Sequence, residues 1–206
     1  MTWTSADEAL AADRHGTTRD GLVARPVVLV GFMGVGKTSV GRELARILDR
    51  PFADTDEMVQ RRSGATIPEL FARGEHGFRA LERAALVDAL ALPGAVVAIG
   101  GGAFVQPGAT ELLLPRALVV HLYTPWRAMV DLLPTLAADR PLIRDNPPWR
   151  VQELFLARAA PYRRAHLRIR LDRSGAAPAA ATIADVLRSQ RREPETIWQP
   201  HRRTGG

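Results

Sequence analysis

The chain has 206 residues, of which 24% are charged and 46% hydrophobic, and its formal net charge is +6. This length and balance are typical of one soluble α/β domain with a sizeable core. Cysteine is absent, which excludes disulfides and thiolate chemistry. No apolar run approaches the roughly 20 residues of a membrane-spanning helix, and the N-terminal segment lacks the basic-then-apolar order of a secretory signal. We therefore expect a cytoplasmic protein with no membrane partner.

The N-terminal part of the chain divides into a leader and a glycine-rich motif. Residues 1–24 are rich in Ala, Thr and Asp and are predicted to form a flexible leader. Residues 27–31 are an apolar, β-branched run, which favours a parallel strand buried on both faces. Gly31–Thr38 then fits the phosphate-binding pattern G-x-x-x-x-G-K-[ST], and an amphipathic helix is predicted over 37–49. This order of strand, glycine loop and helix indicates a phosphate site at the helix N-terminus.

Lys37 is the only lysine among the 28 basic residues of the chain. A compact ammonium on a flexible stem can reach between β- and γ-phosphates, whereas a planar guanidinium is wider and prefers paired acceptors. Chance is the alternative explanation, but the surrounding motif favours a nucleoside triphosphate site. The Thr38 hydroxyl is then placed to bind the Mg²⁺ that accompanies the nucleotide. The predicted nucleotide-binding residues are Gly34, Val35, Gly36, Lys37, Thr38 and Ser39.

The rest of the chain alternates between short apolar runs and helical patterns. Further strands are predicted at 52–54, 95–99, 118–122 and 167–171. Helices are predicted at 57–62, 67–73, 76–92, 149–160 and 179–188, with another between Pro125 and Pro134. Residues 134–148 contain several prolines and no apolar periodicity, which indicates a loop. The alternation predicts a three-layer α/β domain over 25–188, with a five-stranded parallel sheet between helices, followed by a basic flexible tail at 189–206.

Two carboxylates follow the second predicted strand. Ligands of parallel sheets bind outside the carboxyl ends of the strands, so Asp54 and Asp56 should meet the glycine motif at one sheet edge. On an extended segment they would point to the same side. One could then hold a metal-bound water or accept the proton of an attacking hydroxyl, while the other binds substrate hydroxyls. The alternative is a solvated turn in which Asp56 caps the next helix.

Other candidate residues have two open interpretations each. Arg79 and Glu82, three residues apart on a predicted helix, form either a surface ion pair or an oriented arginine that grips an anion. Gly100–Gly102 either exposes backbone N–H groups to a ligand or makes a plain tight turn. Arg140 could close over phosphates from the proline-rich loop. Both Arg140 and Arg158 could also be ordinary surface arginines.

Taken in order, these motifs resemble the shikimate kinase family of nucleoside monophosphate kinase-like P-loop proteins. The resemblance extends over about residues 27–188. Its motifs are GFMGVGKTSVGRELA from Gly31, Phe52–Asp56, IPELFARGEHGFRALERAAL from Ile67, Gly100–Gly102, Arg140–Ile143, and Arg158 with Pro161–Tyr162. The glycine motif alone is generic, but the set in this order is specific to the family.

The resemblance implies a P-loop kinase fold with a lid at about 134–148. It also implies a monomer that uses ATP and Mg²⁺ to phosphorylate the 3-hydroxyl of shikimate, a step of chorismate and aromatic amino acid biosynthesis. Asp56 would bind ring hydroxyls, and Arg79 and Arg158 the carboxylate. Glu82 would orient Arg79, and the backbone of Gly100, Gly101 and Gly102 would contact a hydroxyl. Thr38 and Asp54 would bind the metal. Lys37, Asp54 and Arg140 would act on the reacting groups.

Two positions differ from the family pattern, and two other functions stay open. No arginine lies between Arg127 and Arg140, where the family often places one against adenine, and Arg173 stands about two residues early for the second purine contact. A kinase for a related carboxylated polyol, such as gluconate or a cyclitol, would share the same fold. A non-catalytic nucleotide-binding module could use the arginine-rich tail on nucleic acid. The intact Lys37 and Asp54 favour a kinase with no nucleic-acid partner.

Overall fold

The computed structural model describes residues 25–138, 140–172 and 174–192. The predicted leader, Arg173 and residues 193–206 of the predicted tail lie outside this part of the chain. Within the described part, no helix combines the length and the apolar character needed to cross a membrane.

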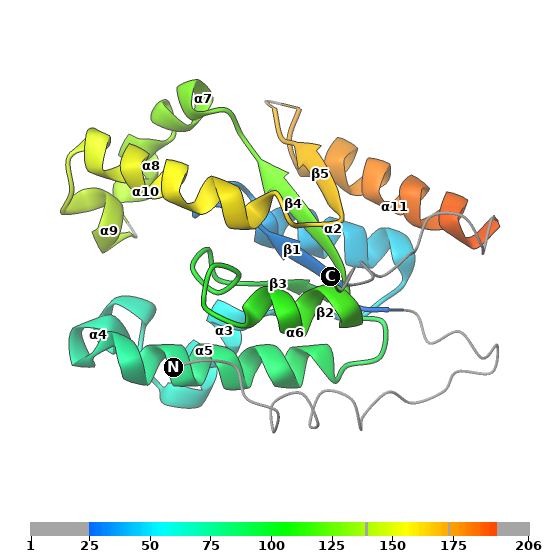
Figure 1. The fold of residues 1–206 in the computed structure, drawn as a ribbon, viewed down its shortest axis with the longest axis horizontal. Coiled ribbons are helices and arrows are strands. Elements are labelled where there is room, and N and C mark those ends of the chain that lie inside the picture. Colours follow the sequence, from blue (N-terminus) through cyan, green and yellow to red (C-terminus); the bar gives the residue numbers. More distant parts are fainter. Residues whose placement is uncertain (1–24, 139, 173, 193–206) are drawn as a thin grey trace, which may run out of the picture.

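A single parallel sheet forms the centre of the molecule (Figure 1). Its strands run in the order β2-β3-β1-β4-β5, and every neighbouring pair is parallel, as predicted. The strands are β1 (Val27–Val30), β2 (Phe52–Asp54), β3 (Val96–Ala98), β4 (Leu118–Tyr123) and β5 (Leu167–Arg170). The four residues of β1 are completely buried, because this central strand is covered on both faces.

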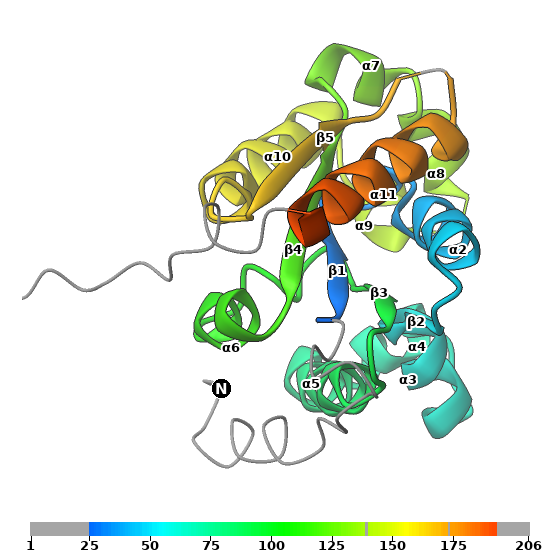
Figure 2. The ribbon, with the colours of Figure 1, turned by 90° about the vertical axis from the view of Figure 1, so that its right-hand side faces the viewer.

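Helices cover both faces of the sheet (Figure 2). One face carries α2 (Lys37–Leu48) and α11 (Ala176–Arg192), and the other carries α5 (Glu75–Leu90), α6 (Ala109–Arg116) and the end of α10 (Pro148–Tyr162). Alternate residues of β1 divide between these layers: Val27 and Leu29 pack with α2 and α11, whereas Val28 and Val30 pack with α5 and α6. The predicted three-layer fold is therefore confirmed.

A smaller helical unit stands beside the carboxyl end of β2. It consists of α3 (Thr55–Ser63) and α4 (Ile67–Arg73), which pack on the first half of α5 around a core of their own. The Thr66 side chain and Glu69 form a reciprocal capping box that fixes the start of α4. This unit holds the N-terminal half of α5 next to the glycine turn after β3.

The segment between β3 and α10 is more helical than predicted. It contains α6, which was not predicted, and then α7 (Trp126–Val130), α8 (Leu133–Ala137) and α9 (Pro141–Arg144). The predicted loop at 134–148 is thus partly helical. Pro134 and Pro141 lie in the first turns of α8 and α9, where a missing N–H costs no hydrogen bond, so proline content is a poor indicator of a loop here.

Candidate active site

The glycine motif wraps around the Lys37 ammonium. Gly36 has φ 97°, a left-handed conformation that favours glycine, and it forms the N-cap of α2. Lys37 Nζ donates to the carbonyl oxygens of Gly31 at 3.0 Å and Phe32 at 3.1 Å. Burial lowers the pKa of Lys37 to about 8, although the nearby carboxylates of Asp56 and Asp54 oppose the shift. The lysine is held inside the loop at the positive end of the helix.

Asp54 links the glycine motif to the next helix. The Thr38 hydroxyl donates to Asp54 Oδ2 at 2.7 Å, while Asp54 Oδ1 accepts from the backbone N–H of Asp56 at 3.0 Å. Asp54 is therefore the N-cap of α3, and the alternative that Asp56 caps this helix is wrong. The predicted extended geometry is also wrong beyond Asp54, because α3 begins at Thr55 and places Asp56 in its first turn.

Asp56 lies beside Glu82 at the glycine turn after β3. A β-carbon on Gly100 would stand 2.9 Å from Asp56 Oδ1 and would overlap Glu82 Oε1. Burial, followed by the charge of Asp54, raises the pKa of Asp56, and Lys37 and nearby arginines partly offset the rise. Gly100 also donates its backbone N–H to the buried Thr55 hydroxyl at 3.1 Å. This turn therefore needs a residue without a side chain at its first position.

Arg79 is held by two carboxylates. Its Nη1 donates to Glu82 Oε2 at 2.8 Å and its Nη2 to Glu75 Oε1 at 2.9 Å. The side chains of Arg79 and Glu82 are only 17% and 5% exposed, so the surface ion-pair alternative is wrong. Burial raises the pKa of Glu82, and the attraction of Arg79 limits that rise. The guanidinium is thus fixed in orientation.

Arg158 approaches the same glycine turn from α10. Its Nη1 donates to the Gly101 carbonyl at 3.1 Å, and the Tyr162 hydroxyl donates to the same oxygen at 2.6 Å. A β-carbon on Gly102 would stand 2.9 Å from Arg79 Nη1. Two arginines from different helices therefore converge on three consecutive glycines. Arg158 is only 9% exposed, so the alternative that it is an ordinary surface arginine is wrong.

The segment with α8 and α9 lies over the glycine motif. A β-carbon on Gly34 would overlap the Leu136 side chain of α8. Arg140 is partly buried, and its charge lies close enough to lower the pKa of both Lys37 and Asp56. Arg140 therefore lies close to Lys37 and Asp56. Of the other predicted nucleotide-binding residues, Val35 has a buried side chain and Ser39 an exposed one.

The structure thus brings the glycine motif, the Asp54–Asp56 segment and the Gly100–Gly102 turn together at one sheet edge. Sequence reasoning gave no role to Thr55, Glu75 or Tyr162, which support Gly100, Arg79 and Gly101. Glu75 could have been found, because it precedes Arg79 by four residues on one helix face. Thr55 and Tyr162 carry no such local signal, since their partners are far away in the sequence.

Comparison with known proteins identifies the family. The sequence model described as shikimate kinase matches residues 33–188. The chain belongs to the shikimate kinase family. A shikimate kinase of Thermus thermophilus is 39% identical over 155 residues, which cover 73% of this chain and 84% of the relative. One from Acinetobacter baylyi is 41% identical over 167 residues, with 79% and 92% covered.

Solved shikimate kinases share the fold. The structure of the Acinetobacter baumannii shikimate kinase in complex with shikimate has a TM-score of 0.75 and 38% identity, and the match covers 81% of this chain and 94% of that one. The Aquifex aeolicus shikimate kinase has a TM-score of 0.69 and 28% identity, with 82% and 99% covered. The family's P-loop kinase fold is therefore the fold of this chain.

Replacing Arg79 with Leu should destabilise this shikimate kinase family member by about 3 kcal/mol, because Glu82 would keep a buried charge without its partner. Adding Glu82→Gln should restore most of the lost stability, since the buried carboxylate left without its arginine would be gone. The measurement is the urea-unfolding free energy. As a control, Arg62→Leu breaks the exposed ion pair with Asp88 and should cost under about 1 kcal/mol. Equal losses from Arg79→Leu and Arg62→Leu would contradict the burial argument.

Proposed function

We propose that this protein transfers the γ-phosphoryl group of ATP to the 3-hydroxyl of shikimate. The observation that carries the proposal is the glycine turn after β3, with Asp56 beside Gly100, Arg158 on Gly101 and Arg79 next to Gly102. A small polyol with one carboxylate suits this arrangement, because arginines bind a carboxylate and a carboxylate accepts hydroxyl hydrogen bonds. The complex of the Acinetobacter baumannii relative with shikimate supports the same acceptor.

In the proposed reaction, the residues around the phosphates work by positioning and charge. The 3-hydroxyl oxygen attacks the γ-phosphorus, the bond to the β-phosphate oxygen breaks, and ADP leaves. Lys37 and Arg140 would stabilise the negative charge on the transferring group. Asp54 lies between Thr38 and Asp56, where it can accept the hydroxyl proton. We assign the backbone of Gly34–Thr38 to the nucleotide phosphates.

Thr38 and Asp54 would also hold Mg²⁺, which neutralises phosphate charge when it binds with the nucleotide. Their oxygens are hard donors 2.7 Å apart at the start of α2, and this fits the ion. No group of three or more His, Cys, Asp or Glu residues in the described part of the chain could hold a metal. Mg²⁺ does not need one, because it takes most of its remaining ligands from phosphates and water.

We further propose that the enzyme acts as a monomer in the cytoplasm. All the residues to which we assign a role come from one chain, so the proposed site needs no second copy. Its co-substrate, ATP, is a cytoplasmic metabolite. Sedimentation of the purified protein tests the oligomeric state: a stable dimer at assay concentration would contradict the proposal.

The function is tested by measuring ADP release from MgATP with shikimate, gluconate or quinate as the acceptor. We expect release that requires shikimate and is nearly abolished in Asp56→Asn. Release that requires gluconate instead would favour the polyol kinase alternative. A folded protein that binds ATP but releases no ADP with any acceptor would favour the non-catalytic alternative.

Gly100→Ala should raise the KM for shikimate by about tenfold or more, because the new methyl group would displace the Asp56 and Glu82 carboxylates. Steady-state kinetics at saturating ATP measure this effect. Gly77→Ala is the matched control: it lies in α5, and a β-carbon added there would have no atom within 4 Å, so alanine should leave KM unchanged and add about 0.5–1 kcal/mol of stability. A normal KM in Gly100→Ala would show that the turn does not contact the acceptor.

A further inference from the structure

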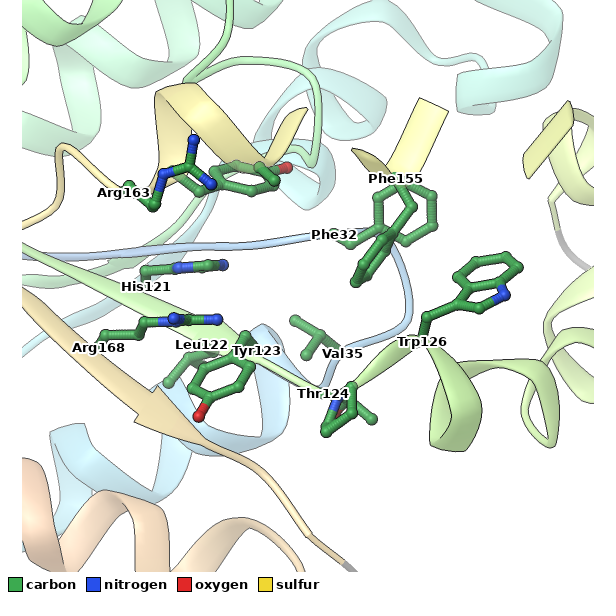
Figure 3. A pocket seen from close by; sticks show the side chains of 13 residues that line it. Phe32, Val35, His121, Leu122, Tyr123, Thr124, Trp126, Phe155, Arg163 and Arg168 are labelled. Atoms are coloured by element: carbon green, nitrogen blue, oxygen red, sulfur yellow. The ribbon is translucent and has the colours of Figure 1, made fainter. Parts of the chain in front are cut away.

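A cavity lies between β4 and α10, next to Phe32 and Val35 of the glycine motif (Figure 3). Its volume is about 260 Å³, enough for a molecule with one or two rings. Of the residues assigned above to nucleotide or acceptor, only Val35 lines it. This cavity is therefore separate from the acceptor site and needs its own explanation.

One end of the cavity is built from aromatic rings. Phe32 and Phe155 meet edge to face, with ring centroids 5.2 Å apart and planes at 71°. Trp126 packs against Phe155 at 5.3 Å. Figure 3 shows these three side chains together on one side of the cavity. Such an end favours a flat ring, which can stack on one aromatic and meet the edge of another.

The other end is basic. Arg168 reaches it from β5 and Arg163 from the residue after α10, and none of the described residues that line the cavity is Asp or Glu. The Arg168 guanidinium lies 3.8 Å from the centre of the Tyr123 ring, which holds it in place without neutralising its charge. Neither arginine forms an ion pair with a residue of the described part of the chain. This end therefore favours an anion.

His121 provides an unpaired polar group at the same end. It is only 6% exposed, and its Nδ1 has no hydrogen-bond partner among the residues that the structure describes. In Figure 3 its ring points into the cavity next to Arg168. Burial, with a smaller effect from Arg168, lowers the pKa of His121 to about 4, so the imidazole is neutral near neutral pH. A neutral imidazole can donate an N–H to a bound carboxylate from the ring nitrogen at its tip, which faces the cavity in Figure 3.

We propose that this cavity binds a small planar aromatic carboxylate. The ring of the ligand lies among Phe32, Phe155 and Trp126, and its carboxylate lies at His121 and Arg168. The ligand must be both aromatic and anionic, because one end of the cavity supplies ring faces and the other supplies donors and positive charge. A ring without an anion, or an anion without a ring, would use only half of the site.

The cavity shares two walls with the acceptor site. Phe32 lies under the Arg158 guanidinium, 5.6 Å from ring centre to Cζ, and Tyr162 donates to the Gly101 carbonyl. A ligand that moves either ring would therefore move a group at the glycine turn. We infer that occupancy changes the KM for the acceptor more than the KM for ATP, and this part of the inference rests on the proposed function.

Binding is tested on the full-length protein by calorimetry with benzoate and indole-3-carboxylate. Benzamide, which is aromatic but neutral, and cyclohexanecarboxylate, which is anionic but not aromatic, are the matched controls. The titrations are repeated with saturating shikimate and ADP. We expect both aromatic carboxylates to bind at least about tenfold more tightly than either control, and to bind still when the active site is occupied.

Two arginine variants locate the site. Arg168→Gln should weaken benzoate binding by about tenfold or more. Arg170→Gln removes an exposed arginine from the same strand that does not line the cavity, and it should leave binding unchanged. No binding of the aromatic carboxylates, equal binding of the controls, complete displacement by shikimate and ADP, or equal losses in both variants would overturn the binding proposal.

Kinetics test the coupling separately. Saturating benzoate should change the KM for shikimate by at least about twofold in the wild-type enzyme and not in Arg168→Gln. An unchanged KM with benzoate bound would overturn the coupling. Absence of any shikimate-dependent turnover would count against the proposed function, whereas calorimetry reports on the cavity without turnover.

Discussion

We expect Lys37→Met to lower kcat for shikimate phosphorylation by at least about a hundredfold and to leave the fold intact. Methionine keeps an unbranched stem of similar length and removes only the ammonium. This ammonium is held at the N-terminus of α2 by the Gly31 and Phe32 carbonyls, from which it can turn toward a phosphate. A fixed positive charge at the transferring phosphoryl group stabilises the transition state more than the ground state, so the loss falls mainly on kcat.

The matched control for Lys37 is Arg46→Met. Arg46 lies on the same helix, is 72% exposed, and pairs with Glu43 on the surface. Its loss removes the same formal charge from α2 but should leave kcat within about twofold of wild type. Wild-type turnover in Lys37→Met would refute the assigned role, and a comparable loss in Arg46→Met would indicate a general charge effect.

Arg158→Gln should raise the KM for shikimate by about a hundredfold, with a much smaller change in the KM for ATP. The variant loses charge-assisted hydrogen bonds to the acceptor carboxylate, each of which contributes about 1.5–3 kcal/mol. The fold should survive. The Gly101 carbonyl would lose its hydrogen bond from Arg158 but would still accept one from the Tyr162 hydroxyl. Initial rates over a matrix of both substrate concentrations separate the two KM values.

The control on the same helix is Arg150→Gln. Arg150 is 59% exposed and pairs with Glu153 near the start of α10, far in sequence from the glycine turn. Both KM values should be unchanged in this variant. If Arg158→Gln changed only the KM for ATP, Arg158 would belong to the phosphate side of the site and our acceptor assignment would be wrong.

Local sequence patterns predicted the local structure around Lys37. The strand, glycine loop and helix around Lys37 are contiguous, so spacing and residue type contain most of the information. The strands β1, β3 and β4 were likewise predictable because they are continuous apolar runs, and β5 because its apolar residues alternate with arginines. The short helices α8 and α9 were not, because they lie in the segment that packs over the glycine motif and their prolines occupy first turns.

The acceptor side shows where sequence patterns stop being sufficient. Asp54 and Asp56 look equivalent in the sequence, but the start of α3 makes Asp54 the helix cap and turns Asp56 toward Glu82. Arg79 and Glu82 have the spacing of a surface pair, and only the packing of α5 against the glycine turn buries them. Whether a charge is solvated or buried depends on elements that meet in space, which sequence spacing does not record.

The fold class and the succession of strand, glycine loop and helix around Lys37 were predictable from the sequence, because each depends on short-range periodicity or on a contiguous motif. Tertiary structure alone decided which carboxylate caps α3, that two arginines from α5 and α10 converge on one glycine turn, and that His121, Arg168 and a set of aromatic rings enclose a cavity. These features join residues from separate elements, and their positions follow from how the helices pack on the sheet.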